Sequence, residues 1–555
     1  MTAQSIPALA LPQPRHLIVA TLAIGIVTLA WLPPALPQQG RVVLAVSALA
    51  VLGWIGTRIP ESIVALSSVL VLVLGGVLTE TQLFAALGSE LVWLLLASFV
   101  IAAVAKEAGL TQRLVAPLLA RGMGVLPFFM VLTLAITATA FVLPSTSGRA
   151  ALLLPVFAAI AGGVPEAGLR RALALLFPTV ILLSAGASLI GAGAHLLAAQ
   201  AIRNATGLRL GYLEWAMLGL PFSALASMIG AALILLIFVP REQWLRPLPR
   251  IALPLPSPQE RRRQRRIGAV LSALVGLWLT TDLHGIGMAM VALLGALVLL
   301  TPPFTAKRPK EVFRAVDTEL LLYMTATILM AEAMTTSGTD RWLAGLALAA
   351  LPPALSDSLP AVVVLMAVTA VLAHLAITSR SARAAVLIPA VALPLGALGH
   401  DPALVIMVAV MGTGFCQSMM ASAKPVAIFG NAENAGFDQS DLLRLALPLA
   451  PAVTALLIAF ALLVWPAQLS GLRGDAPNPP PPAASLVAPS IALMPPAAPQ
   501  KTIAAARPVP RPAQLRKTGT QPRPVSRHVH RHSAKGALRD MNHALRPLGI
   551  RLIVR

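Results

Sequence analysis

The sequence predicts an all-α polytopic membrane protein made of two inverted repeats with re-entrant hairpins and broken helices. Hydrophobic residues make up 57% of the 555 residues and charged residues only 11%, whereas a soluble domain carries about 25% charged residues. The mean hydropathy is +0.82, and one serine- and arginine-bearing motif occurs twice. This composition argues against soluble enzymes and nucleic-acid-binding folds. The single cysteine, Cys416, excludes a disulfide framework or a multi-cysteine metal site.

Apolar stretches long enough to cross a membrane recur along the whole chain. A helix needs about 20 mostly apolar residues to cross the hydrocarbon core. Two further stretches, 125–162 and 355–397, are about twice that length and have a polar centre with arginine. We expect both to be re-entrant hairpins, because irregular backbone at membrane depth is tolerated only inside protein or beside a cavity. The predicted spans, about eleven in number, are 17–34, 42–57, 61–79, 90–107, 172–200, 216–239, 267–281, 285–301, 319–336, 402–430 and 445–466.

The predicted organisation follows from these spans and from where the basic residues lie. Lys and Arg in short loops favour the cytoplasm, which places the N-terminus inside the cell, the C-terminal tail outside, and the protein in the inner (plasma) membrane. Much of the formal charge of +21 lies on the proline-rich tail, which cannot bury a core and should be disordered. That tail either contacts anionic lipid or has no specific partner. The segments are an N-terminal part with the first helix (1–40), repeat one (41–240), a basic cytoplasmic linker (241–266), repeat two (267–466) and the tail (467–555).

The repeated motif supplies the candidate binding groups. Both copies read Ser-x-Ser-x-Arg-Ala-Ala and end in a proline, at Pro155 and Pro389. A broken helix presents unpaired N–H groups and a positive dipole end, which suit an anion. Serine hydroxyls donate hydrogen bonds, and arginine grips a carboxylate or phosphate with two parallel bonds. The predicted substrate-binding residues are Ser145, Thr146, Ser147, Arg149, Ser379, Arg380, Ser381 and Arg383.

Each motif is followed by another apolar segment that small and polar residues interrupt. Inverted repeats with broken helices are typical of secondary transporters, which bind their cargo near the membrane midplane. An alternative is that Arg149 and Arg383 pair with buried acids, such as Glu90, Glu107, Glu319 or Glu332, while the serines only satisfy hairpin backbone. The residues predicted to lie at the helix breaks or to support the site are Ser188, Gly191, His195, Ser422, Lys424 and Pro425.

In these residues the sequence resembles the divalent-anion:sodium symporter family of the ion transporter superfamily, over about 41–466. That family carries Ser-Asn-Thr at each hairpin tip, ten residues before a proline, where this chain has Ser145-Thr146-Ser147 and Ser379-Arg380-Ser381. The arginines that follow are similar to those of its citrate/succinate antiporter and dicarboxylate translocator branch. The resemblance implies a scaffold and a transport domain, commonly in a homodimer, that move di- or tricarboxylates or sulfate by an elevator-like motion.

The departures from the family pattern concern sodium. Both signature asparagines are absent, and the broken helices contain His195 and Lys424 where the family has Thr-Pro-Pro-Asn. In the family these elements build sodium sites from oxygen atoms, whereas Arg380 and Lys424 place positive charge there. We therefore expect anion binding to depend on fixed charge, with transport by exchange or coupled to protons, and with His195 as a candidate titrating group. No metal site or cofactor is predicted, and the role of sodium stays open.

Two other functions are consistent with parts of the sequence. A cation/proton antiporter or a metalloid-oxyanion permease of the same superfamily would place buried, unpaired acids at the helix breaks, which carry basic or small residues instead. An intramembrane enzyme could use Ser145 or Ser147 with His195. Repeated serine motifs suit symmetric binding better than one catalytic centre, so we expect a transporter of small anions and no enzyme.

Overall fold

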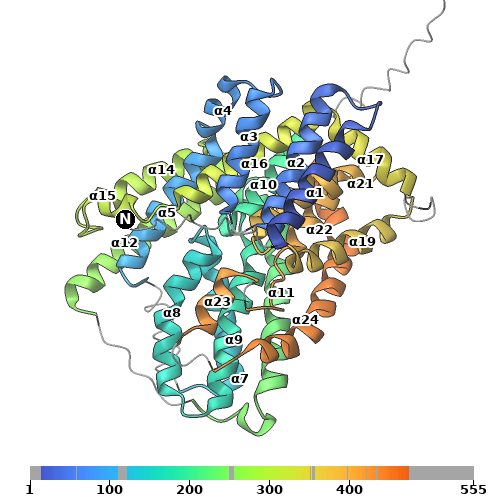
Figure 1. Ribbon diagram of the computed structural model, residues 1–555. Coiled ribbons are helices and arrows are strands. Elements are labelled where there is room, and N and C mark those ends of the chain that lie inside the picture. Colours follow the sequence, from blue (N-terminus) through green and yellow to red (C-terminus); the bar gives the residue numbers. More distant parts are fainter. Residues whose placement is uncertain are drawn as a thin grey trace, which may run out of the picture. The chain divides into compact units, whose positions relative to one another are not determined.

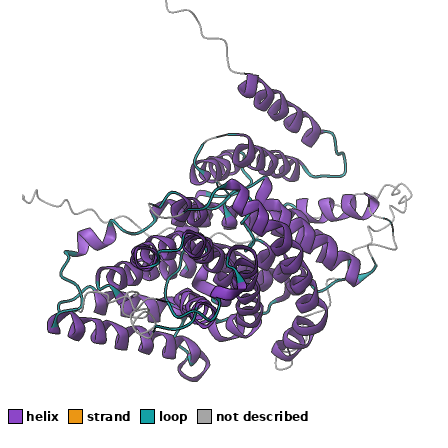
Figure 2. Cartoon of the chain, turned by 90° about the horizontal axis from the view of Figure 1, so that it is seen from below, coloured by secondary structure: helices purple, strands orange, loops and turns teal. Residues whose placement is uncertain are grey.

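A computed structural model describes residues 14–473, except for 58, 111–121, 249–255, 351, 353–356, 397, 421 and 433–435. These residues belong to one compact unit, Met1–Pro482. Figure 2 shows helices joined by loops, and no strand occurs in the ranges just given. The predicted all-α fold class is therefore confirmed. The predicted disordered tail lies outside the described residues from 474 onward, whereas residues 467–473 continue the last helix.

The first half of the chain contains a helix hairpin and a broken helix in the predicted order. Leading helices come first, the hairpin follows at the first motif, and the broken helix precedes a long final helix. The elements are α1 (Pro14–Trp31), α2 (Gln38–Gly56), α3 (Glu61–Leu74), α4 (Glu80–Leu87), α5 (Glu90–Glu107), α7 (Val125–Ala138), η1 (Thr139–Phe141), α8 (Thr146–Gly163), α9 (Ala167–Leu183), η2 (Ser184–Ala187), η3 (Leu189–Gly191), α10 (Gly193–Thr206) and α11 (Tyr212–Phe238).

The second half repeats this order. Its hairpin lies at the second motif, and its broken helix is interrupted between residues 413 and 423. The elements are η4 (Arg241–Gln243), α12 (Pro258–Leu279), α13 (Thr281–His284), α14 (Met288–Leu299), α15 (Pro309–Phe313), α16 (Thr318–Thr336), α17 (Thr339–Ala350), α19 (Leu359–Leu372), η5 (Ala373–Leu375), α20 (Arg380–Leu387), the π-turn η6 (Ile388–Ala392), α21 (Leu393–Gly396), α22 (Pro402–Gly412), α23 (Lys424–Gly430), α24 (Gln439–Ala459), the π-turn η7 (Phe460–Val464) and α25 (Trp465–Arg473).

Helix length and composition indicate several membrane crossings. Six helices in the described ranges are long and apolar enough to cross a bilayer. The first arm of each hairpin, α7 in one and α19 in the other, has only 14 residues. At 1.5 Å per residue this is about 21 Å, which is less than the thickness of the hydrocarbon core. This length suits the predicted hairpins. Their re-entrant path and the number of eleven spans stay predictions.

One predicted boundary changes in the structure. Ser257 caps the start of α12 by accepting a hydrogen bond from the Glu260 amide, and the Glu260 side chain accepts one from the Ser257 amide in return. This reciprocal cap fixes the helix start. Residues 258–266, which the sequence assigns to the basic linker, therefore form the first turns of α12.

The two halves exchange contacts at their broken helices. The second part of the first broken helix, α10, packs on α20 and α22, while the second part of the other, α23, packs on α8 and α9. Figure 1 shows α7, α8, α9 and α23 side by side in one region and α2, α3, α4 and α16 in another. The rings of Phe157, Phe177 and Phe429 form a cluster between α8, α9 and α23. Each hairpin is thus fixed against both halves.

Candidate functional site

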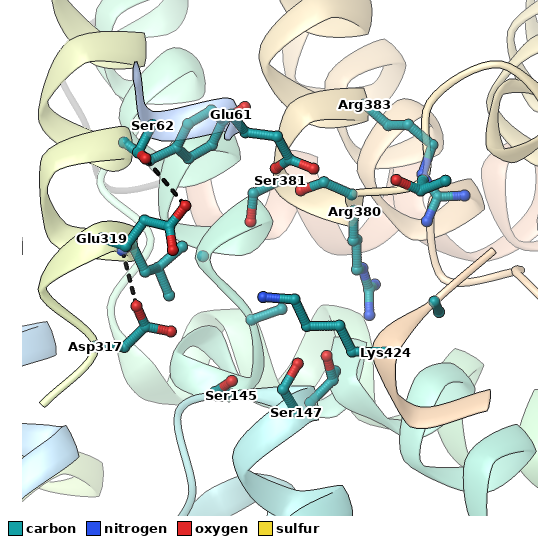
Figure 3. Close-up of a pocket in the computed structure, with 18 of the residues that line it drawn as sticks. Glu61, Ser62, Ser145, Ser147, Asp317, Glu319, Arg380, Ser381, Arg383 and Lys424 are labelled. Atoms are coloured by element: carbon teal, nitrogen blue, oxygen red, sulfur yellow. Dashed lines mark hydrogen bonds between the residues drawn. The ribbon is translucent and has the colours of Figure 1, made fainter. Parts of the chain in front are cut away.

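The hairpin tips and helix breaks border a common cavity of about 430 Å³. This volume lies within the usual range for small-molecule sites, about 300–1,000 Å³. Figure 3 shows side chains from α3, α16, both hairpins and α23 around this space. The predicted residues that line it are Ser145, Thr146, Ser147, Ser379, Arg380, Ser381, Arg383, Lys424 and Pro425.

The two hairpin tips have the same local structure because both begin a helix with serine. Ser145 accepts a hydrogen bond from the Gly148 amide at 3.3 Å, and Ser379 accepts one from the Ala382 amide at 3.3 Å. A serine at the N-cap satisfies one of the unpaired amides of the first turn. The remaining amides and the positive dipole ends of α8 and α20 are directed toward the cavity lining.

The helix breaks also match each other in backbone geometry. Ala192 (φ −159°, ψ 152°) precedes α10, and Ala423 (φ −158°, ψ 144°) precedes α23. Both residues line the cavity. A Cβ at Gly193 would lie 2.8 Å from the Met324 sulfur. Glycine therefore permits the close approach of α10 to α16.

Arg149 does not line the cavity. Its side chain is fully buried and donates four hydrogen bonds within the protein. The acceptors are the Thr139 hydroxyl, the Ser184 hydroxyl, and the carbonyls of Ile136 and Ile181. The guanidinium thus fastens the first hairpin to the end of α9, and no acid is among these partners. The predicted substrate contact of Arg149 has no support in this geometry.

Arg380 and Arg383 belong to the cavity wall, although Arg380 is 8% exposed and Arg383 is fully buried, and both also bind backbone at helix breaks. Arg380 donates to the Leu182 carbonyl of the other half at 3.1 Å and to Thr413 at 3.3 Å. Arg383 donates to the Phe415 carbonyl at 3.1 Å and to the Cys416 sulfur at 2.6 Å, and its buried Nε has no partner among the described residues. Both guanidinium groups therefore place positive charge at the negative ends of α9 and α22.

Lys424 is the most accessible cation of the set. It is exposed and makes no hydrogen bond or ion pair with any residue that the structure describes. Figure 3 shows its side chain extending toward the space between Glu319 and the hairpin serines Ser145 and Ser147. An ammonium group in this position can pair with a bound anion without first breaking an interaction with another residue.

The other residues predicted at the helix breaks lie behind the cavity wall. Ser188, Gly191, His195 and Ser422 do not line it. His195 is fully buried against the Trp215 ring, with Nδ1 3.0 Å from the Ser188 carbonyl. Gly191 is a structural requirement, because a Cβ there would lie 2.2 Å from a backbone oxygen. These four residues support the breaks without reaching the cavity.

The cavity also has an acidic wall that the repeated motifs do not indicate. Glu61 begins α3, Asp317 caps α16 and Glu319 lies in its first turn, and all three line the cavity with Tyr323. Ser62 donates a hydrogen bond to Glu319 at 3.0 Å. Glu319 was weighed only as an ion-pair partner for an arginine, and it forms no such pair with a described residue. The available signal was an acid at the start of each of two apolar helices.

The family comparison agrees with this architecture. The model of the sodium:sulfate symporter transmembrane region matches residues 13–470, which is most of the chain.

This chain belongs to the sodium:sulfate symporter family.

Members of the sodium:sulfate symporter family are transporters and not enzymes, so the chain is a multi-pass membrane transporter. No curated protein has a significantly similar sequence. The YdaH transporter of Alcanivorax borkumensis is similar in structure, with a TM-score of 0.50 and 17% identity over 78% of this chain and 99% of that one. Neisseria gonorrhoeae MtrF, described as an antimetabolite efflux pump, has a TM-score of 0.50 and 14% identity over 80% and 98%. At such identities the likeness concerns the fold alone.

Proposed function

We propose that this protein carries small anions with two or three negative charges, chiefly di- or tricarboxylates with sulfate as the second candidate, across the plasma membrane. The observation that carries the proposal is the cavity, which both hairpin tips and three cationic side chains line: Arg380, Arg383 and Lys424. Hydroxyls, helix N-termini and guanidinium groups together are the donors that recognise carboxylate and sulfate oxygens.

Fixed positive charge takes part of the role that sodium has elsewhere in the family. Arg149 and Arg380 donate to the neighbouring carbonyls of Ile181 and Leu182 at the end of α9. Carbonyl oxygens at a helix break are suitable ligands for a hard cation. Because guanidinium groups already bind these two carbonyl oxygens, the oxygens are not free to coordinate sodium. Transport should therefore continue in the absence of sodium.

Several finer features belong to the same proposal. The chain most resembles the citrate/succinate antiporter and dicarboxylate translocator branch in its hairpin arginines. It works as a homodimer with a static scaffold and an elevator-like transport domain that carries both hairpins. The N-terminus lies in the cytoplasm and the tail outside. The packing of α10 and α23 on the opposite hairpins supports a transport domain that moves as one body.

Counterflow in liposomes tests this function. The purified protein is reconstituted with internal unlabelled succinate, citrate or sulfate, and uptake of the radiolabelled anion is measured with and without sodium. Uptake of at least one dianion without sodium is expected. Strict dependence on sodium would refute the role of fixed charge, and no uptake of any dianion would refute the substrate class.

Two variants locate the binding site. Arg380→Ala and Lys424→Ala each remove a donor that the bound anion would meet, which costs about 1.5–3 kcal/mol, or roughly 10–150-fold in Kd. The matched controls are Arg203→Ala at the far end of α10 and Lys310→Ala on α15, both exposed and outside the cavity. We expect the two control variants to bind the anion with the wild-type Kd and the two cavity variants to bind it more weakly. Equal Kd values in all four would place the anion elsewhere.

A further inference from the structure

The acidic wall of the cavity has no role in the function proposed so far. Glu61 on α3 is half-buried and lines the cavity together with Ser379 of the second hairpin tip. Glu319 on α16 lies on the same wall, where it accepts a hydrogen bond from Ser62, the neighbour of Glu61 in the chain, and Tyr323 of α16 also lines this wall. Lys424 and Arg383 face Glu61 from the opposite side, but neither forms a direct ion pair with it. Glu61 thus shares its wall with a second acid and forms no ion pair with the cations opposite.

The charges of the lining residues cancel. The described residues around the cavity include three acids, Glu61, Asp317 and Glu319, and three bases, Arg380, Arg383 and Lys424. With every group ionised, the wall has no net charge to attract a dianion. A bound dianion beside these acids adds negative charge next to their carboxylates, which favours the protonated form of one of them. Protonation of one acid would leave the wall net positive.

The structure distinguishes this pair of acids from the equivalent contact between the two halves. Helix α5 of the first half packs on α14 of the second, as α3 packs on α16. Glu90 begins α5 and Glu319 lies in the first turn of α16, but Glu90 faces Gly287 in place of a second carboxylate. Glu90 does not line the cavity. The paired carboxylates are therefore found at the copy of this contact that borders the cavity.

We propose that Glu61, with Glu319 as its partner, takes up a proton when the anion binds, so that the protein transports dianion and proton together. The proposal rests on the anion-carrier function above. The bound anion adds negative charge beside the pair, which favours Glu61–COOH, and by linkage the protonated pair favours the anion. The proton comes from the side on which the anion enters and leaves with it on the other. His195 is not required, because it lies behind the cavity wall.

The test uses the full-length protein in detergent with sulfate, and with fumarate as a second probe, because both stay doubly charged in neutral and mildly acidic solution. Isothermal titration calorimetry in buffers of different ionisation enthalpy gives the Kd and the proton uptake together. The wild-type Kd should fall by up to about tenfold for each pH unit of acidification, with uptake approaching one proton per anion. Glu61→Gln, which imitates the protonated acid, should bind at neutral pH as the wild type does in acid, without proton uptake.

A second variant and a matched control sharpen the test. Glu319→Gln removes the neighbouring negative charge, so the pH at which Kd changes should move to lower values. Glu90→Gln, the equivalent position away from the cavity, should behave as the wild type. Wild-type binding that ignores pH, or Glu61→Gln with the wild-type pH profile and proton uptake, would overturn this inference alone. No binding of either anion at any pH would overturn the proposed function and this inference with it.

Discussion

Replacing Arg149 by methionine removes four hydrogen bonds of 2.7 to 2.9 Å while keeping most of the side-chain volume. Hydrogen bonds to a charged group each contribute about 1.5–3 kcal/mol. Part of the stability lost with these hydrogen bonds is recovered, because the variant no longer buries a guanidinium group. The variant also leaves buried neutral acceptors without their donor, at about 1–3 kcal/mol for each unsatisfied group, and we expect a net loss of several kcal/mol in the free energy of unfolding.

The measurement is thermal unfolding of the purified protein in detergent, combined with the anion Kd of the folded fraction. The Arg149→Met variant should lose several degrees in Tm but bind anion with a Kd close to that of the wild type below its own transition. Arg203→Met, which changes an exposed arginine at the end of α10, is the control and should leave Tm unchanged. A variant with wild-type Tm and abolished binding would show that Arg149 contacts the anion.

Three further predictions concern packing, the cysteine and pH. Gly219→Ala should destabilise the fold by more than about 2 kcal/mol, because its Cβ would lie 2.2 Å from a backbone oxygen. Gly268→Ala has open space around it and should stabilise α12 by about 0.5–1 kcal/mol. Chemical unfolding measures both changes. Cys416 is fully buried with its sulfur 2.6 Å from the Arg383 guanidinium, so N-ethylmaleimide should not modify it in the folded protein, and rapid modification under native conditions would contradict this burial. The Ser440 hydroxyl and nearby amides lower the pKa of Asp438. The ionised Asp438 therefore stabilises the fold at neutral pH, and this effect is lost as pH falls through the lowered pKa. Asp438→Ala should reduce Tm at neutral pH and match the wild-type Tm in strong acid.

The helical architecture was predictable because the membrane restricts the choice of structures. Apolar runs of span length have few alternatives to a helix in a bilayer. The serine of each motif also announces a helix start, since a serine N-cap is a local feature of sequence. Both motifs accordingly begin a helix, α8 and α20, and helices are interrupted after α9 and after α22. Helix α12 starts earlier than the basic residues of its first turns suggest, and the Ser257–Glu260 cap is the local signal of that start.

The roles of individual side chains were less predictable. Arg149 and Arg383 occupy the same position of the motif, yet only Arg383 lines the cavity. Which way a long side chain extends depends on the carbonyls that neighbouring segments offer, and these segments are distant in sequence. Glu61 was overlooked for the same reason. Its partners are on α16 and α20, and neither contact has a signature in the residues around position 61.

The difference between the two motif copies has a physical consequence for a carrier. Where the first copy has Thr146, the second has Arg380, whose side chain reaches across to the Leu182 carbonyl of the other half. Permanent positive charge in the cavity would hold a dianion tightly, but it would also make the empty cavity costly to move through a hydrocarbon layer. The acids opposite it remove that cost when ionised. If these acids accept protons as the anion binds, the lining is positive when an anion is bound and neutral when the carrier returns empty. The same arginines can therefore serve in the loaded step and in the empty return step of the transport cycle.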